Sequence, residues 1–145
     1  MRRSALTWSL VVLELFLAAG GLYGGLSLIS DPTGAALSMP SQTVLAGTPF
    51  ANFLVPGVVL FAVNGVFPLV VAIAELMRAW WVRYAHVLVG ALLTGWMGVQ
   101  VWLIGLSAGI QVMYLLLGLL ILTLAAATWP DLPPRHGGGR WASHA

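Results

Sequence analysis

The sequence predicts an all-α fold, a bundle of four transmembrane helices with both termini on the cytoplasmic side. Three observations lead to this prediction: the composition is strongly apolar, four segments are long enough to cross a bilayer, and the arginines all fall on one side of it. Of the 145 residues, 60% are hydrophobic and 7% are charged, whereas soluble domains carry about a quarter charged residues. We therefore expect a bilayer to be the main solvent for this surface.

A helix that crosses the hydrocarbon core needs about 20 mostly apolar residues. Four segments meet this requirement, at about 5–29, 50–77, 84–106 and 111–129. They make one transmembrane domain over residues 1–129, and the Pro- and Gly-rich segment 130–145 is expected to be a disordered cytoplasmic tail. The first segment could instead be a cleaved signal peptide, but it is longer than the usual apolar core of about 7–15 residues and contains an acid.

The arginines predict the orientation. Two precede the first segment, two separate the second from the third, and two follow the fourth, which places them all on one side: Arg2, Arg3, Arg78, Arg83, Arg135 and Arg140. The positive-inside rule then puts both termini in the cytoplasm. The use of arginine without lysine fits a GC-rich bacterial genome, so we expect a multi-pass protein of the bacterial plasma (inner) membrane.

The connection between the first two segments, SDPTGAALSMPSQTVLAGT, is long and carries the turn-forming residues Pro and Gly. We expect this outer loop to fold onto the mouth of the bundle or to lie in the membrane interface. Thr48 is the expected N-cap of the second helix, with Pro49 at its first position. Asp31, at the start of the loop, is a candidate outer-loop site.

Glu14 is an acid in the middle of the first segment. It shares a helical face with mostly small residues at alternating spacings of four and three, Thr7, Val11, Ala18, Gly21 and Gly25. Small residues mark the faces on which membrane helices pack, so Glu14 is expected to point at other helices. An ionised acid at this depth costs about 2.5–3.5 kcal/mol, and no Lys or Arg lies within helical reach. We therefore expect a neutral, hydrogen-bonded carboxyl group.

Depths estimated from a rise of about 1.5 Å per residue place Glu14 near three further polar residues. They are Asn64, Thr94 and Thr123, and the four make a candidate intramembrane polar cluster. Pro68 displaces the backbone carbonyl of Asn64, which indicates either a plain kink or a binding site. Thr94 belongs to a stripe of small residues that predicts packing between the first and third helices or between the third and fourth.

Two more titratable residues lie near the predicted cytoplasmic ends. Glu75 precedes Arg78 by three residues, which predicts an ion pair at the interface. His86, just inside the third segment, is also expected to be interfacial. His136 and His144 in the tail are a further, minor possibility for metal binding. The chain has no cysteine, which excludes disulfides and Cys-ligated metals.

Several stretches, GGLYGG, DPTGAALSMP, GTPFANFLVPG and WMGVQVWLIG followed by IQVMYLLLG, resemble a group of small four-helix bacterial membrane proteins with no assigned activity. The resemblance covers about residues 20–118 and implies a plasma-membrane protein with a shaped outer loop. The layout of four helices is also similar, more distantly, to that of DoxX-like membrane proteins.

Three functions fit these observations. The first is a non-enzymatic accessory or partner-binding bundle, because the sequence offers no catalytic, cofactor or metal motif. The second is a small proton-coupled transporter using Glu14, whose place in the first of four helices is similar to the layout of small multidrug resistance pumps. The third is a lipid- or quinone-handling enzyme with Asp31 or Glu14 as acid/base. Expected partners are the lipid bilayer and a second copy or another membrane protein, with no nucleic acid.

Overall fold

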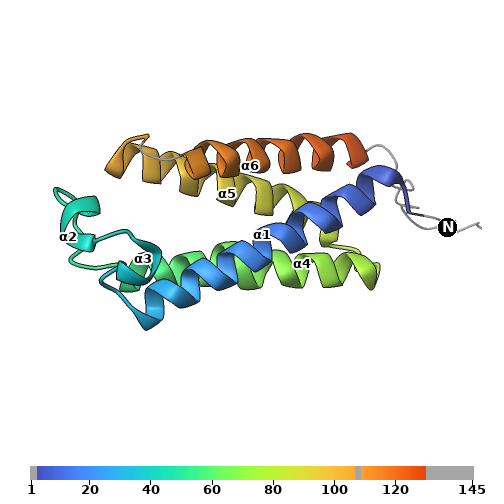
Figure 1. The fold of residues 1–145 in the computed structure, drawn as a ribbon. Coiled ribbons are helices and arrows are strands. Elements are labelled where there is room, and N and C mark those ends of the chain that lie inside the picture. Colours follow the sequence, from blue (N-terminus) through green and yellow to red (C-terminus); the bar gives the residue numbers. More distant parts are fainter. Residues whose placement is uncertain (1–2, 107–108, 130–145) are drawn as a thin grey trace, which may run out of the picture.

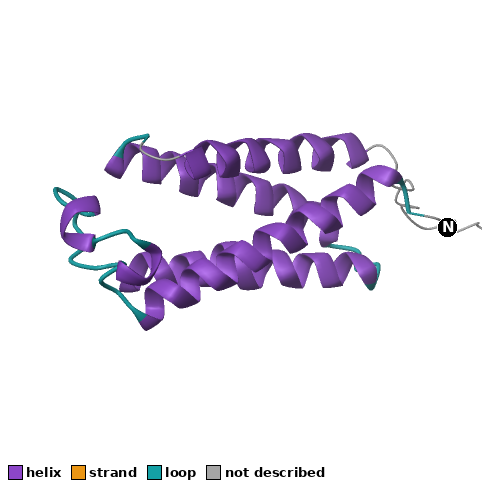
Figure 2. Cartoon of the chain, viewed as in Figure 1, coloured by secondary structure: helices purple, strands orange, loops and turns teal. Residues whose placement is uncertain are grey.

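The computed structural model of the chain describes residues 3–106 and 109–129, and its regular elements there are all helical. Four long helices run antiparallel to their neighbours in sequence (Figures 1 and 2). They are α1 (Ala5–Ser30), a second helix of three consecutive pieces, α3 (Leu54–Val59), η2 (Leu60–Val66) and α4 (Phe67–Leu76), then α5 (Val82–Ile104) and α6 (Gly109–Thr128). All four are long and apolar enough to cross a membrane. The predicted fold class is confirmed in this respect.

The second long helix begins at Leu54, four residues later than predicted. Thr48 does not cap it, because the helix begins only at Leu54. The Thr48 hydroxyl instead donates to the carbonyl of Leu45 and accepts from the N–H of Phe50. Phe53 is buried, and its N–H donates to the carbonyl of Pro32 at 2.9 Å. The segment before Leu54 is therefore held in the loop, and the helix starts only where that attachment ends.

The connection between α1 and α3 folds back on the end of the bundle. It contains two short helices, η1 (Ala35–Leu37) and α2 (Ser41–Val44). Leu45 and Phe53 from the connection bury against Leu28 of α1 and form a small apolar cluster of their own. Of the two placements that we expected for the loop, the structure has the one on the bundle mouth. We call this end of the bundle the loop end.

Helix α1 packs most closely on the second long helix, not on α5 as one of our two predicted pairings had it. A side chain at Gly21 would collide with the backbone carbonyl of Asn64, and one at Gly25 would meet the backbone of Phe61. The facing helix contributes glycines of its own, since Gly65 lies against the backbone of Leu22. Because these glycines have no side chain, the two backbones can touch. Small residues allow the same close approach between membrane helices in general.

Helices α5 and α6 form the other close pair, which confirms the second predicted pairing. Gly90 of α5 packs against Leu122 of α6, and Gly118 of α6 packs against Thr94 of α5. Figure 1 shows α1 running obliquely, near α6 at its N-terminal end and beside α3 at its C-terminal end. The two pairs are joined by a core that includes Leu10 and Leu17 of α1, Val71 of α4, Leu93 of α5 and Ile121 of α6.

The middle of the second long helix is a π-helix, η2. Pro68 has no N–H to donate to the carbonyl of Asn64, so α-helical hydrogen bonding cannot continue through this turn. The N–H of Phe67 bonds instead to the carbonyl of Ala62, five residues earlier. The irregularity predicted at Asn64 is thus present as a π-turn, a feature often found at functional sites.

Candidate functional site

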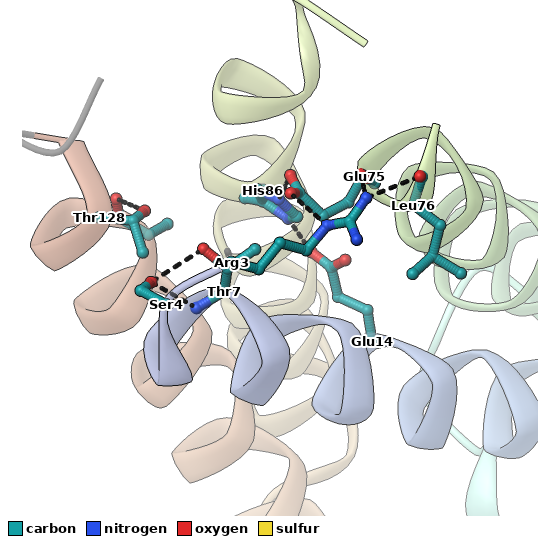
Figure 3. Close-up of polar contacts among 9 residues, drawn as sticks. Arg3, Ser4, Thr7, Glu14, Glu75, Leu76, His86 and Thr128 are labelled. Carbon is teal, nitrogen blue, oxygen red and sulfur yellow. Dashed lines mark hydrogen bonds and ion pairs between the residues drawn. The ribbon is translucent and has the colours of Figure 1, made fainter. Parts of the chain in front are cut away.

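A row of four charged or titratable side chains lies at the end of the bundle opposite the loop (Figure 3). The row consists of Glu14 from α1, His86 from α5, Glu75 from the last turn of α4, and Arg3 from just before α1. We call the first three the Glu14–His86–Glu75 array. The end of the bundle that carries Arg3 is called the arginine end, because Arg78 and Arg83 also lie in or beside the connection there.

His86 is the centre of the array. Its Nδ1 lies 2.6 Å from Glu14 Oε1, and its Nε2 lies 3.1 Å from Glu75 Oε2. The whole residue is 3% exposed, so the side chain points into the bundle. The reason is its place on α5, where the face that includes Val82, Ala85 and Val89 turns into the bundle.

The row leads from the interior to the surface. The side-chain exposure is 0% for Glu14, 4% for His86, 15% for Glu75 and 19% for Arg3. Arg3 Nε lies 3.7 Å from Glu75 Oε1, and the same guanidinium donates to the backbone carbonyls of Glu75 and Leu76. The last carbonyls of a helix carry partial negative charge. Arg3 therefore balances negative charge both at the end of α4 and on Glu75. Glu75, predicted to pair with Arg78, contacts His86 and Arg3.

The hydrogen-bonding geometry fixes a minimum number of protons. A carboxylate is an acceptor only, and a neutral imidazole has one donor and one acceptor nitrogen. Because each ring nitrogen faces a carboxyl oxygen, the three groups must hold at least two protons between them. Either the imidazolium lies between two carboxylates, or a neutral ring lies between one carboxylate and one carboxylic acid. In both arrangements the array has a net charge of −1, which the Arg3 guanidinium balances.

The array can pass a proton without moving its side chains far. A proton arriving on one ring nitrogen allows the proton on the other nitrogen to leave, because the two nitrogens belong to one conjugated ring. Glu75 is the partly exposed end of this path and Glu14 is the buried end. The second oxygen of Glu14, Oε2, has no hydrogen-bond partner among the described residues.

The predicted partners of Glu14 are elsewhere. Thr94 donates its hydroxyl to the carbonyl of Gly90, one turn back on its own helix. Thr123 likewise bonds to Leu119 and is exposed on α6, so it takes no part in the packed interior. Asn64 is 1% exposed on η2, and neither atom of its amide has a partner among the described residues. The expected polar cluster is thus corrected, since the hydrogen-bond partner of Glu14 is His86.

Asp31 does not belong to the same site. It follows the last residue of α1, about 25 Å along the helix axis from Glu14. Its carboxylate accepts bonds from the hydroxyl and N–H of Thr33 and from the N–H of Ala36. The bonds from Thr33 and Ala36 hold the pKa of Asp31 below its ordinary value, because they favour the ionised form. Asp31 therefore shapes the loop.

Sequence reasoning missed His86 as a partner of Glu14, although one signal was present. His86 lies one turn after Val82, three residues before Val89 and seven before Leu93, and all four share a helical face that is buried. A histidine on an apolar face near a membrane end needs a polar partner. Glu75, across the short α4–α5 connection, was the nearest acid in sequence.

The array does not have the geometry of a metal site. Within residues 3–106 and 109–129, no group of three or more His, Cys, Asp or Glu side chains is arranged to hold a metal ion. The two acids of the array contact opposite edges of the imidazole ring and do not converge on one point. His136 and His144 lie outside the described residues.

No protein family, curated protein or solved structure matches the chain. The resemblances to small four-helix bacterial membrane proteins and to DoxX-like membrane proteins therefore stay predictions.

Proposed function

We propose that this chain is a multi-pass integral membrane protein that acts as a small proton-coupled transporter. Its proton-carrying groups are Glu14, His86 and Glu75. The observation that carries this proposal is the contact of both His86 ring nitrogens with carboxyl groups inside the apolar bundle. Chains of Asp, Glu and His in transmembrane segments are the usual proton relays of pumps and transporters.

The proposed orientation puts the arginine end in the cytoplasm of a bacterial cell. It is supported by Arg3, Arg78 and Arg83, which lie at that end of the described bundle and follow the positive-inside rule. Protons would then enter or leave the array from the cytoplasmic side through Glu75. The loop end would face the cell exterior.

The alternative is an accessory bundle in which the array is a structural strut. The complete burial of Glu14 favours this second candidate, because Leu10 and Leu17, one turn before and after it on α1, are also buried in the apolar core. In that case the hydrogen bonds of His86 would serve to tie α1, α4 and α5 together. An enzyme working with Asp31 has less support, because Thr33 and Ala36 of the loop already donate hydrogen bonds to the Asp31 carboxylate.

Counting protons tests the first requirement of the transporter, which is that the array gains and loses protons. The full-length protein is placed in unbuffered liposomes, and the protons released when the medium is changed from mildly acidic to mildly alkaline are measured with a pH dye. We expect Glu14→Gln and His86→Asn to release fewer protons per chain than the unchanged protein. Thr94→Val is the matched control, since it removes a partly buried hydrogen bond of the same bundle without touching the array.

The thermal midpoint of each variant is measured in parallel to confirm that it is folded. Equal proton release by the unchanged protein and by folded Glu14→Gln and His86→Asn would overturn the transporter proposal. If those variants changed only the thermal midpoint, the array would be a strut. A pH gradient imposed across the same liposomes then tests vectorial movement, which we expect to be slower in Glu14→Gln.

A further inference from the structure

A second polar feature of the arginine end lies where α5 begins and α6 ends. The guanidinium of Arg83 lies 5.4 Å from the ring centre of Trp129 and 5.8 Å from that of Tyr84. The two rings contact each other edge to face, with centroids 5.4 Å apart. Two side chains of α5 and one that directly follows α6 therefore hold one another in place, without a contact to the Glu14–His86–Glu75 array.

The contacts of Arg83 leave its hydrogen-bonding capacity unused. A guanidinium carries five N–H donors around its edge, whereas an aromatic ring attracts the positive charge through its own π-face. Arg83 has no carboxylate or carbonyl partner among the described residues. Its positive charge is thus held in position by the rings while its donors remain available.

The position of this group at the helix ends indicates what the donors meet. Tyr84 is 47% exposed and Trp129 is 42% exposed, and such rings favour the level of the lipid headgroups. Trp80, in the α4–α5 connection at the same end of the bundle, is 79% exposed. With the chain in a bilayer, we therefore expect the free edge of Arg83 to lie at the depth of the lipid phosphates.

We propose that Arg83, Tyr84 and Trp129 form a binding site for the headgroup of an anionic phospholipid. Arg83 binds the phosphate through its paired N–H groups, a geometry that a guanidinium offers and an ammonium does not. The two rings fix the guanidinium and cover the upper part of the lipid chains. Arg3 cannot form an equivalent site, because Glu75 and two backbone carbonyls already engage its guanidinium.

The test measures lipid retention by native mass spectrometry. The full-length protein in detergent is titrated with phosphatidylglycerol and, separately, with phosphatidylcholine of the same acyl chains. We expect preferential retention of phosphatidylglycerol, and a loss of about tenfold in Arg83→Gln, as for the loss of one charge-assisted hydrogen bond. Trp129→Leu, which keeps the charge but removes a ring that positions it, should lose part of the preference.

Arg78→Gln is the matched control, since it removes the same charge at the same end of the bundle. An equal loss in Arg78→Gln and Arg83→Gln would overturn the proposal, because it would show attraction to overall charge. Displacement of the lipid by inorganic phosphate at equal concentration would also overturn it, because the ligand would then be a free anion.

The lipid-binding proposal rests on the proposed membrane location but not on proton transport. Different results would therefore overturn the lipid-binding proposal and the transport proposal. If the chain were not a membrane protein, neither phospholipid would be retained. If only the transport proposal were wrong, Glu14→Gln would release as many protons as the unchanged protein while the preference for phosphatidylglycerol remained.

Discussion

At the scale of single residues, several buried or partly buried charged groups have a defined set of polar partners. His86 bridges two carboxyl groups, and Arg3 covers one of them together with the end of α4. Asp31 is surrounded by donors from its own loop. These arrangements limit the cost of charge in a chain that is only 7% charged.

The bonds to Asp31 predict how the loop end responds to acid. Its pKa is below the ordinary value of an aspartate, so the stabilisation by Thr33 and Ala36 is present at neutral pH and is lost as the pH falls through the folded pKa. In an NMR titration, we expect the Ala36 amide shift to change with a midpoint below the ordinary pKa of an aspartate. Asp31→Asn should show no such change, and a midpoint at or above the ordinary value would contradict this reading.

The sequence allowed Glu14 to be placed on an inward face, but it did not reveal the hydrogen-bond partner. The inward direction follows from helical periodicity within one segment. The partner depends on how α5 is rotated about its axis and how deeply it sits beside α1, which neither periodicity nor a depth count determines. Thr94 and Thr123 were closer to Glu14 in estimated depth than His86 was, yet both bond to their own helices.

At the scale of the helices, contact between backbones determines which elements pair. Gly21 and Gly25 bring α1 against η2 so closely that a Cβ on either residue would meet backbone atoms. Gly95 of α5, by contrast, has open space where a side chain would be. The sequence does not distinguish a glycine in a helix contact from one that faces open space. The stripe of small residues on the first helix therefore predicted which face packs, but not which helix packs against it.

This difference predicts opposite effects of the same substitution. Gly21→Ala should destabilise the protein by about 1–3 kcal/mol, because the new methyl group forces α1 away from η2. Gly95→Ala should leave stability unchanged or raise it by about 0.5–1 kcal/mol, because alanine loses less backbone freedom in a helix. Unfolding by denaturant in detergent micelles measures both. A larger loss in Gly95→Ala than in Gly21→Ala would contradict the packing described.

At the scale of the whole molecule, hydropathy and helix length were enough to predict the four long helices, because each must supply its own run of about 20 apolar residues. They were not enough to predict where the second one starts. Phe53 is apolar and was predicted to be part of the helix, but it packs with Leu28 of α1 and Leu45 of the loop. Tertiary packing of the loop thus shortened the helix at a place that hydropathy could not show.

The orientation can be tested by labelling, since the chain contains no cysteine. Single cysteines are introduced at Gln42 in α2 and at Met77 after α4, both exposed and at opposite ends of the bundle. In intact cells we expect a membrane-impermeant thiol reagent to label Gln42→Cys but not Met77→Cys. Permeabilised cells, in which both should react, provide the control. The reverse pattern in intact cells would contradict the proposed orientation.

The most direct test of the central claim is the protonation state of His86 itself. The sequence has three histidines, so His136→Ala together with His144→Ala leaves His86 as the sole one. In the ¹⁵N-histidine-labelled protein in lipid, the shifts of Nδ1 and Nε2 report each nitrogen's proton. We predict a reversible change of protonation with pH, with a midpoint that moves in both Glu14→Gln and Glu75→Gln. A single protonation state throughout the pH range in which the protein stays folded would contradict the account.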